Sequence, residues 1–224
     1  AAVWAQSPNW QTMAVEAPGI EQRTFESETL GCRVSYHVYL PDQYQAEPDR
    51  RFPVLYWLHG SRGGLPGIAP LSERFGAAMR EGRMPPMIVV FANGLSYTLW
   101  VNSRDGRVPM ETVVIEELVP HIDATLRTIA SREGRVVEGF SMGGYGALRF
   151  GLKYPELFCA ASSLGGGPLQ QELPRVRDEQ RSVALEAVFG GDREYFRELS
   201  PWALAGQNAE SVSESGLLLR MAIG

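Results

Sequence analysis

The chain has 224 residues, a length that one large α/β domain commonly reaches. Its 44% hydrophobic and 21% charged residues are those of an ordinary globular protein, and 24 glycines and 15 prolines are too few for a low-complexity or collagen-like chain. The net charge of −5 and the pI near 5.3 argue against a nucleic-acid partner, because such proteins usually carry a basic surface.

No stretch of the sequence approaches the roughly 18 consecutive apolar residues that cross a bilayer, and the first ten residues lack the features of a signal peptide. We therefore expect a soluble chain without a membrane partner, either cytoplasmic or secreted after removal of a signal. The two cysteines, Cys32 and Cys159, are too few for a disulfide framework and leave the compartment open.

Two kinds of strand pattern follow an N-terminal arm of residues 1–19. Residues 20–40 alternate polar and apolar side chains, which predicts a hairpin of two half-buried strands at the edge of a sheet. Residues 52–60 and 87–94 are continuous apolar runs that end in glycine, as parallel strands covered on both faces do.

Helical periods separate and follow these strands. Residues 68–82 and 110–126 repeat apolar side chains at helical spacing, and Pro120 is expected to bend the second helix or to mark a junction in it. The alternation continues with a strand, a helix and another strand at residues 135–140, 143–155 and 157–167. This order predicts a doubly wound, mostly parallel α/β sheet with an antiparallel N-terminal edge.

The last part of the chain changes character. Residues 168–215 are polar and acidic and predict a helical excursion that lies over the strand ends, whereas residues 216–224 predict one more buried strand. No linker divides the sequence, so we expect a single domain that spans residues 1–224.

The sequence GFSMG at residues 139–143 fits the pattern G-x-S-x-G and lies between a predicted strand and a predicted helix, the context that this motif requires. The glycines leave room for a strained turn that lifts the Ser141 hydroxyl above the sheet edge, because a Cβ at either flanking position would collide with the turn. The motif predicts Ser141 as a nucleophile. A Gly-Ser turn without chemistry is the alternative.

A second motif, LHGSRGG at residues 58–64, follows an upstream buried strand. Hydrolases with a nucleophile turn place a Gly-rich loop at this point, and its backbone N–H completes an oxyanion hole. We therefore expect the Met142 N–H and an N–H of Gly60 or Ser61 to be the two donors. A phosphate-binding loop is the alternative, but the spacing fits neither G-x-G-x-x-G nor the P-loop.

The segment EGFSMGGYGAL at residues 138–148, followed by KYPELFCAASSLGG, resembles the esterase family of α/β hydrolases, which includes esterase D, S-formylglutathione hydrolase, feruloyl, acetylxylan and enterochelin esterases and the mycolyltransferases. RVSYHVYLPDQY, FPVLYWLHG and WVNSRDG are similar to the same family in the same order. The resemblance covers roughly residues 25–224. It implies an α/β-hydrolase fold, Ser141 as nucleophile, and a substrate pocket that Tyr97 and Trp100 help to line.

The histidines depart from the family pattern. In this fold the triad runs along the chain as Ser, then Asp or Glu, then His, but His37, His59 and His121 all precede Ser141. We expect His37 to be exposed on an edge strand, His59 to belong to the LHG turn and His121 to be structural. Asp178 and Asp192 lie in the helical excursion and are expected to face solvent.

We therefore expect residues 1–224 to be truncated on the C-terminal side, without the last strand and helix and without the triad acid and histidine. A longer chain, a complementing segment or a second subunit would supply them, since an exposed edge of a parallel sheet is rarely tolerated.

The predicted activity is carboxylic ester hydrolysis through an acyl-enzyme, acting on a small ester or thioester without a cofactor or metal. An acyltransferase and a non-catalytic binding or scaffold protein with this fold are the alternatives.

Overall fold

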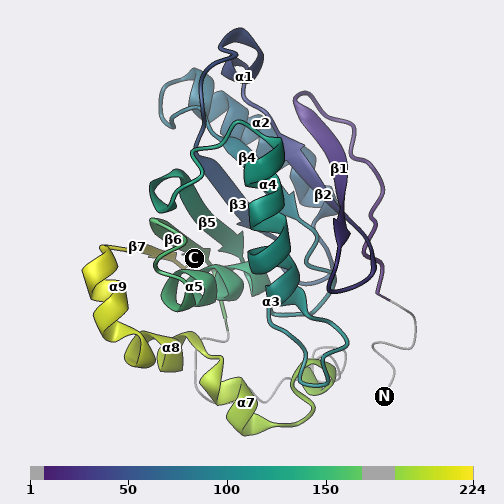
Figure 1. The fold of residues 1–224 in the computed structure, drawn as a ribbon, viewed down its shortest axis with the longest axis vertical. Coiled ribbons are helices and arrows are strands. Elements are labelled where there is room, and N and C mark those ends of the chain that lie inside the picture. The colour runs from purple at the N-terminus through teal and green to yellow at the C-terminus, as the bar shows by residue number, and fades with distance from the viewer. Residues whose placement is uncertain (1–7, 168–184, 224) are drawn as a thin grey trace.

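The computed structural model describes residues 8–167 and 185–223, and a seven-stranded sheet runs through its centre (Figure 1). The strand order is β1-β2-β4-β3-β5-β6-β7. The first two strand pairs in this order are antiparallel and the other four are parallel. The predicted sheet, mostly parallel with an antiparallel N-terminal edge, is confirmed. The strands are β1 (Ile20–Ser27), β2 (Cys32–Tyr39), β3 (Val54–Leu58), β4 (Ile88–Ala92), β5 (Arg135–Phe140), β6 (Ala160–Leu164) and β7 (Leu218–Ala222).

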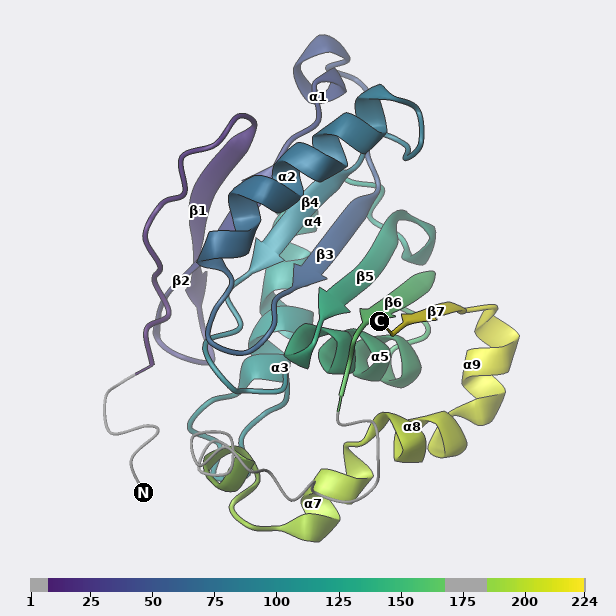
Figure 2. The ribbon, with the colours of Figure 1, turned by 180° about the vertical axis from the view of Figure 1, so that it is seen from behind.

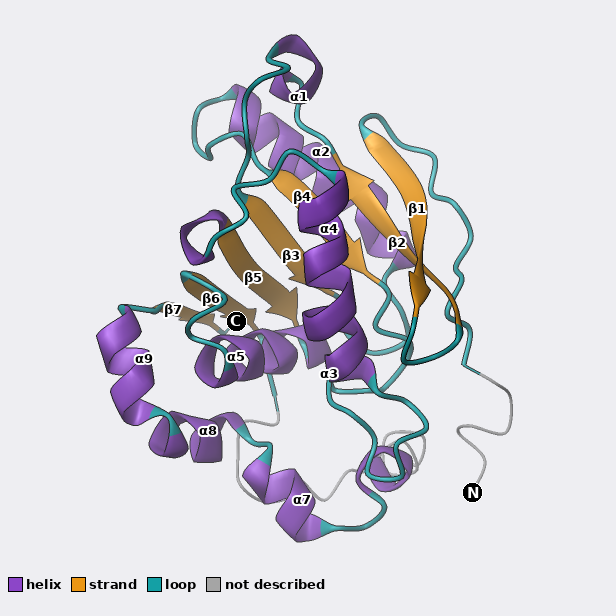
Figure 3. Cartoon of the chain, viewed as in Figure 1, coloured by secondary structure: helices purple, strands orange, loops and turns teal. Residues whose placement is uncertain are grey.

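The helices form a layer on each side of this sheet (Figures 2 and 3). Helix α2 covers one face, and α3, η1, α4 and α5 cover the other (Figures 1 and 2). The helical segments are α1 (Gln43–Ala46), α2 (Leu65–Arg80), α3 (Met110–Thr112), the π-helical η1 (Val113–Leu118), α4 (Val119–Thr125), the short 3-10 turn η2 (Arg132–Gly134), α5 (Met142–Lys153), α7 (Arg193–Glu198), α8 (Pro201–Gln207) and α9 (Ala209–Ser215).

The central strands are buried on both faces, as their continuous apolar runs predict. Leu55 and Trp57 of β3 pack in the core beneath α2, whereas Val54 and Tyr56 of the same strand pack in the larger core on the other face. Alternate side chains of a strand point to opposite faces of a sheet, so an apolar residue at every position fills both cores.

The N-terminal hairpin pairs Ile20 with Tyr39 and Ser27 with Cys32. Only β1 lies at the edge, because β2 also pairs with β4, and all side chains of β2 from residue 34 to residue 39 are buried. The expectation that His37 is exposed is therefore wrong: it is 2% exposed. Alternation in the sequence marks the edge strand correctly but does not show which strand of the hairpin has a second neighbour.

Residues 110–125 form one helical path that changes geometry along its length, from α3 through η1 to α4. Pro120 lies in the first turn of α4, directly after the π-helical segment. Proline has no N–H to donate to the preceding turn, so a break in the regular hydrogen-bond pattern is expected at this residue. The predicted junction at Pro120 is found.

The C-terminal region contains helices α7 to α9, of which α8 packs against α5 while α7 and α9 flank α8 (Figure 1). Asp192 caps α7 by accepting from the Tyr195 N–H and pairs with Arg104, while Asp178 lies outside the described residues. Strand β7 pairs with β6 but is not buried as expected: Leu218 is 70% and Met221 67% exposed. Its place at the end of the sheet explains this difference.

Candidate active site

Ser141 occupies the turn between β5 and α5, with φ of 56° and ψ of −115°. This region of backbone space is sparsely populated by residues other than glycine and costs on the order of 1–3 kcal/mol. Two hydrogen bonds hold the turn: the Ser141 N–H donates to the Leu164 carbonyl at 2.9 Å, and the Tyr145 N–H donates to the Ser141 carbonyl at 3.1 Å. The side chain is half-buried at the carboxyl edge of the sheet.

The two flanking glycines are required by the tightness of the turn and by the close approach of β3. A Cβ at Gly139 would collide first with the carbonyl group of Gly143 in the same turn and would also lie 2.7 Å from the Leu58 carbonyl oxygen. One at Gly143 would overlap the same oxygen and lie 2.8 Å from the carbonyl oxygen of His59. Both distances are shorter than ordinary van der Waals contact, so only glycine permits this turn to pack against the end of β3.

The loop after β3 approaches the Ser141 turn from the other side. A Cβ at Gly60 would lie 3.3 Å from the Ser141 Cβ, so the two backbones are nearly in contact. Met142 is the first residue of α5, and the first N–H groups of a helix have no partner within the helix. Gly60 and the amino end of α5 thus lie next to Ser141, and Ser61 lines the same cleft.

Gly60, Ser61 and Ser141 line a cleft of about 520 Å³. Phe140 is 56% exposed beside Ser141, and Arg62 donates from Nε to the Tyr97 hydroxyl at 3.0 Å, which brings Tyr97 beside a residue of the cleft wall. Trp100 lies elsewhere: its side chain is 0% exposed and belongs to the core, so its predicted place in the pocket lining does not match the structure. The cleft is lined by Trp57, His59, Gly60, Ser61, Arg62, Gly63, Gly64, Pro66, Gly67, Leu71, Phe140 and Ser141.

His59 also borders the cleft, but both of its ring nitrogens are engaged. Its Nε2 lies 3.0 Å from the Gly94 N–H, and its Nδ1 lies 2.7 Å from the Gly60 carbonyl oxygen. Burial lowers the pKa of this imidazole below its usual value. His59 is therefore held neutral within the loop and has no nitrogen directed at Ser141.

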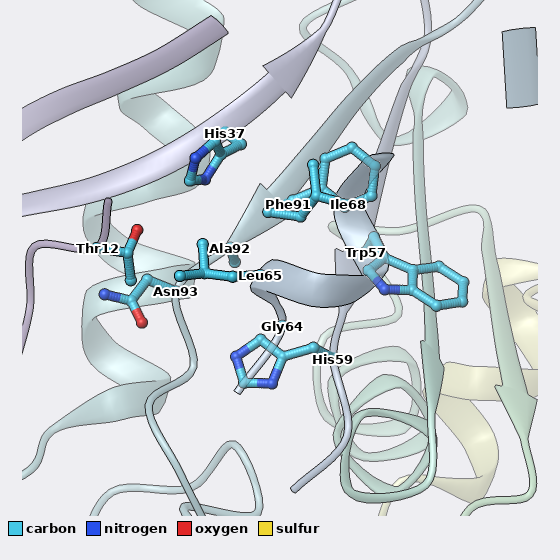
Figure 4. A pocket seen from close by; sticks show the side chains of 10 residues that line it. All are labelled: Thr12, His37, Trp57, His59, Gly64, Leu65, Ile68, Phe91, Ala92 and Asn93. Atoms are coloured by element: carbon cyan, nitrogen blue, oxygen red, sulfur yellow. The ribbon is translucent and has the colours of Figure 1, made fainter. Parts of the chain in front are cut away.

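The other two histidines lie away from Ser141. His121 Nε2 is 3.1 Å from the Tyr36 hydroxyl, and its ring packs against Phe25. His37 borders a separate small cavity of about 20 Å³, which His59 also lines (Figure 4). Among the described residues, neither His37 nor His121 lines the cleft that contains Ser141.

A buried ionic cluster anchors α5, and the motifs do not reveal it. Arg149 is fully buried and pairs with Glu111 at 2.8 Å, and it donates to the carbonyl oxygens of Leu199 at 2.6 Å and Trp100 at 3.2 Å. Lys153 and the Tyr154 hydroxyl also bind the Glu111 carboxylate. The sequence does contain one signal: a single arginine inside the otherwise uncharged segment of residues 143–152.

Burial and the positive charges of this cluster shift the pKa of Glu111 in opposite directions. Burial alone would raise the pKa of the carboxyl, but Arg149 and Lys153 outweigh it and lower the pKa to about 2. The carboxylate therefore stays charged at neutral pH and holds α5 to the segment that precedes η1.

Neither a metal centre nor a membrane span is found in the part of the chain that the structure describes. Residues 8–167 and 185–223 contain no group of three or more His, Cys, Asp or Glu placed to hold a metal ion. They also contain no helix of the length and apolarity that a bilayer requires.

Comparison with known sequences agrees with this geometry. The sequence model of the Esterase family, described as "Putative esterase", matches residues 27–216. The chain belongs to the Esterase family. The match includes both the Gly-rich loop after β3 and the Ser141 turn.

Two curated relatives are named as esterases. Esterase Rv1288 of Mycobacterium tuberculosis is 38% identical over 144 residues, which are 63% of this chain and 31% of the relative. An endo-1,4-beta-xylanase/feruloyl esterase of Xylanibacter ruminicola is 33% identical over 184 residues, 78% of this chain and 25% of the relative. The chain thus spans about a third or less of the length of these relatives.

Solved structures share the α/β-hydrolase fold of this Esterase-family chain. An S-formylglutathione hydrolase from Agrobacterium tumefaciens superposes with a TM-score of 0.70 at 20% identity, over 93% of this chain and 88% of the solved one. The fluorophosphonate-binding serine hydrolase FphF of Staphylococcus aureus gives a TM-score of 0.67 at 21% identity, over 93% and 79%. These similarities establish the expected fold.

Proposed function

We propose that this Esterase-family chain is a serine esterase in which Ser141 is the nucleophile. The observation that carries the proposal is the turn itself: a serine with φ of 56° whose side chain opens into a cleft beside Gly60, Ser61 and Met142. A strained backbone at one serine is maintained by the surrounding packing, and such conformations cluster at functional sites. The family match and the esterase relatives support the same reaction class.

In this mechanism the Ser141 Oγ attacks the carbonyl carbon of an ester or thioester as its proton passes to a base. The carbonyl π electrons move onto oxygen, and the N–H groups of Met142 and Ser61 stabilise the resulting oxyanion. Collapse of the tetrahedral intermediate expels the alcohol or thiol, which takes up a proton. Water then attacks the acyl-enzyme in the same two steps, which releases the acid and restores the Ser141 hydroxyl.

The base is the part of the mechanism that the three histidines do not supply. His59 uses both ring nitrogens within its own loop, and His37 and His121 lie outside the cleft. We therefore propose that the base comes from outside the described residues, from a further segment or a second chain. If so, His121→Gln leaves the rate at which Ser141 reacts unchanged, whereas a loss comparable to that of Ser141→Ala would make His121 the base.

The cleft favours an acyl or alcohol group with apolar surface. Trp57, Leu71 and Phe140 supply most of its large side chains, and Arg62 adds one cationic group at its wall. Apolar pockets with a few polar groups are typical of small-molecule sites. Small esters and thioesters are thus the proposed substrates. Water and a second alcohol could both accept the acyl group, so product analysis with added alcohol separates hydrolase from acyltransferase.

A fluorophosphonate probe tests the proposal. Wild-type protein that includes the segment or chain supplying the base should gain the mass of one phosphonyl group, located on the peptide that contains Ser141, and Ser141→Ala should gain none. Ser61→Ala is the matched control, because it removes another cleft hydroxyl but keeps the backbone N–H. If wild-type protein remains unlabelled with its base-supplying segment or chain present, the alternative of a non-catalytic binding or scaffold protein is favoured.

A further inference from the structure

We propose that His59 and Trp100 are positioning residues, which together fix the direction of two successive backbone N–H groups in the loop opposite Ser141. The inference rests on the proposed function, since it concerns the donors that would stabilise the oxyanion. Neither side chain needs to touch the substrate. Each binds a carbonyl oxygen of the loop and thereby sets the orientation of the peptide group to which that oxygen belongs.

The first peptide group joins His59 to Gly60. The indole Nε1–H of Trp100 donates to the His59 carbonyl oxygen at 3.2 Å. In a planar trans peptide, the C=O and the N–H point to opposite sides. A fixed carbonyl therefore fixes the Gly60 N–H on the side away from the indole ring.

The second peptide group joins Gly60 to Ser61, and the tautomer of His59 follows from its partners. The Gly94 N–H can only donate, so the His59 Nε2 at 3.0 Å must be the unprotonated acceptor. The proton of the neutral ring is then on Nδ1, which donates to the Gly60 carbonyl oxygen at 2.7 Å. The Ser61 N–H is consequently directed away from the imidazole, and Ser61 itself lines the cleft with Ser141.

The packing around the two rings leaves them little freedom. The imidazole and the indole meet edge to face with centroids 5.1 Å apart. A Cβ at Gly64 would lie 2.7 Å from the His59 ring, and Figure 4 shows the two residues side by side. A Cβ at Gly146 of α5 would lie 2.7 Å from the Trp100 Cβ. The loop after β4 therefore packs against the loop after β3, and helix α5 packs against both loops.

The chemical consequence is pre-organisation. Donors that already point to the position of the oxyanion need no reorganisation during the reaction, and removal of one such donor typically lowers kcat by about 100- to 1000-fold. Loss of the bond that orients a donor leaves the donor present but less well aligned. We therefore expect a smaller effect, on the order of 10- to 100-fold, in the rate at which Ser141 attacks.

The decisive experiment compares the second-order rate constants for fluorophosphonate labelling of Ser141 in Trp100→Phe and Trp10→Phe. Both variants replace a buried tryptophan by a smaller aromatic ring, but only Trp100 donates to the loop, while Trp10 lies on the N-terminal arm. Trp100→Phe should label on the order of 10- to 100-fold more slowly than wild type. Trp10→Phe should label at the wild-type rate.

Equal labelling of Trp100→Phe and wild type would overturn the positioning role but leave Ser141 as the nucleophile. Wild-type protein that does not label even with the segment or chain that supplies the base present would overturn the proposed function, and with it the catalytic role of the loop. The two failures are therefore distinguishable.

Two further measurements address His59. An Asn side chain places its amide nitrogen close to the position of the His Nδ1, so His59→Asn keeps the donor to the Gly60 carbonyl, whereas His59→Ala loses it. His59→Asn should therefore label faster than His59→Ala, and equal rates would contradict the role. Long-range ¹H–¹⁵N spectra of the wild-type protein should show His59 protonated on Nδ1 at neutral pH; protonation on Nε2 would contradict it even if the variants do not fold.

Discussion

A single methyl group at residue 143 would be incompatible with the turn that presents Ser141. The Cβ of an alanine at this position would overlap the carbonyl oxygen of Leu58, which belongs to the backbone of β3 and cannot rotate away. Either the strand end or the first turn of α5 would have to move. Because Met142 begins that turn, the change would displace a proposed oxyanion donor as well.

Gly143→Ala should therefore lower the rate of ester hydrolysis by at least about 100-fold, the scale of losing one oxyanion donor. Gly206→Ala in α8 is the matched control, since nothing lies within 4 Å of its added Cβ and alanine is the better helix former. p-Nitrophenyl acetate hydrolysis, measured on both variants at equal folded fraction by circular dichroism, checks this. Activity of Gly143→Ala close to wild type would show that the turn tolerates a side chain.

The residues of the site differ in how far the sequence predicts them. GFSMG at residues 139–143 is a local pattern whose glycines, serine and flanking elements are all adjacent in the chain, so its geometry is predictable. His59 and Trp100 are 41 residues apart, and His59 and Gly94 are 35 apart. Nothing in the local sequence shows that an indole N–H from one loop binds a carbonyl of the other, which is why Trp100 is expected in the pocket and is found beneath it.

At the scale of elements, helix α5 connects the proposed nucleophile to the rest of the fold. Ser141 precedes its first turn, and Arg149 in its middle binds Glu111, the Trp100 carbonyl and the Leu199 carbonyl. One buried guanidinium thus links α5 to three other segments. Breaking such a pair by removing one partner leaves a buried charge without compensation.

Glu111→Gln should therefore destabilise the protein by about 3–5 kcal/mol. The exposed pair of Glu26 and Arg33 supplies the control, because Glu26→Gln breaks an ion pair with the same residue types at the surface and should cost at most about 1 kcal/mol. Urea denaturation followed by fluorescence gives both values. Equal effects of the two substitutions would argue against a stabilising role for the buried cluster.

The hydrophobic pattern of the sequence predicts most of the helices and strands, and the features that it misses have a physical reason. Apolar runs identify β3 and β4, and helical periodicity identifies α2 and the helical path from α3 to α4, because burial on one or both faces leaves a periodic trace. The burial of β2 and the exposure of β7 depend on which strands are neighbours in the sheet. Neighbours are set by the topology of the whole chain, and the composition of one segment does not contain that information.

At the scale of the whole molecule, the three histidines make stability depend on pH. Burial holds the pKa values of His37, His59 and His121 below the ordinary value of 6.5. The unfolded chain binds protons near that pH and the folded chain does not until lower pH, so acid favours unfolding. Glu111 adds a second pH range in which stability falls, because its pKa in the folded protein, about 2, lies below the ordinary 4.5.

The free energy of unfolding should thus be nearly constant above about pH 7, fall as the pH decreases toward 5, and fall again below about pH 4.5 as Glu111 loses its charge in the unfolded state first. Urea midpoints measured from pH 8 to pH 4 test this, with His121→Gln expected to flatten the first decline. A midpoint that stays constant or rises between pH 7 and 5 would show that the histidines are not held neutral by the fold.

The most direct test of the central claim is a crystal structure of the fluorophosphonate adduct. We expect a covalent bond from the Ser141 Oγ to phosphorus, with the phosphoryl oxygen about 2.7–3.1 Å from the backbone nitrogens of both Met142 and Ser61. An adduct on another residue, or a phosphoryl oxygen that points away from both nitrogens, would contradict the claim.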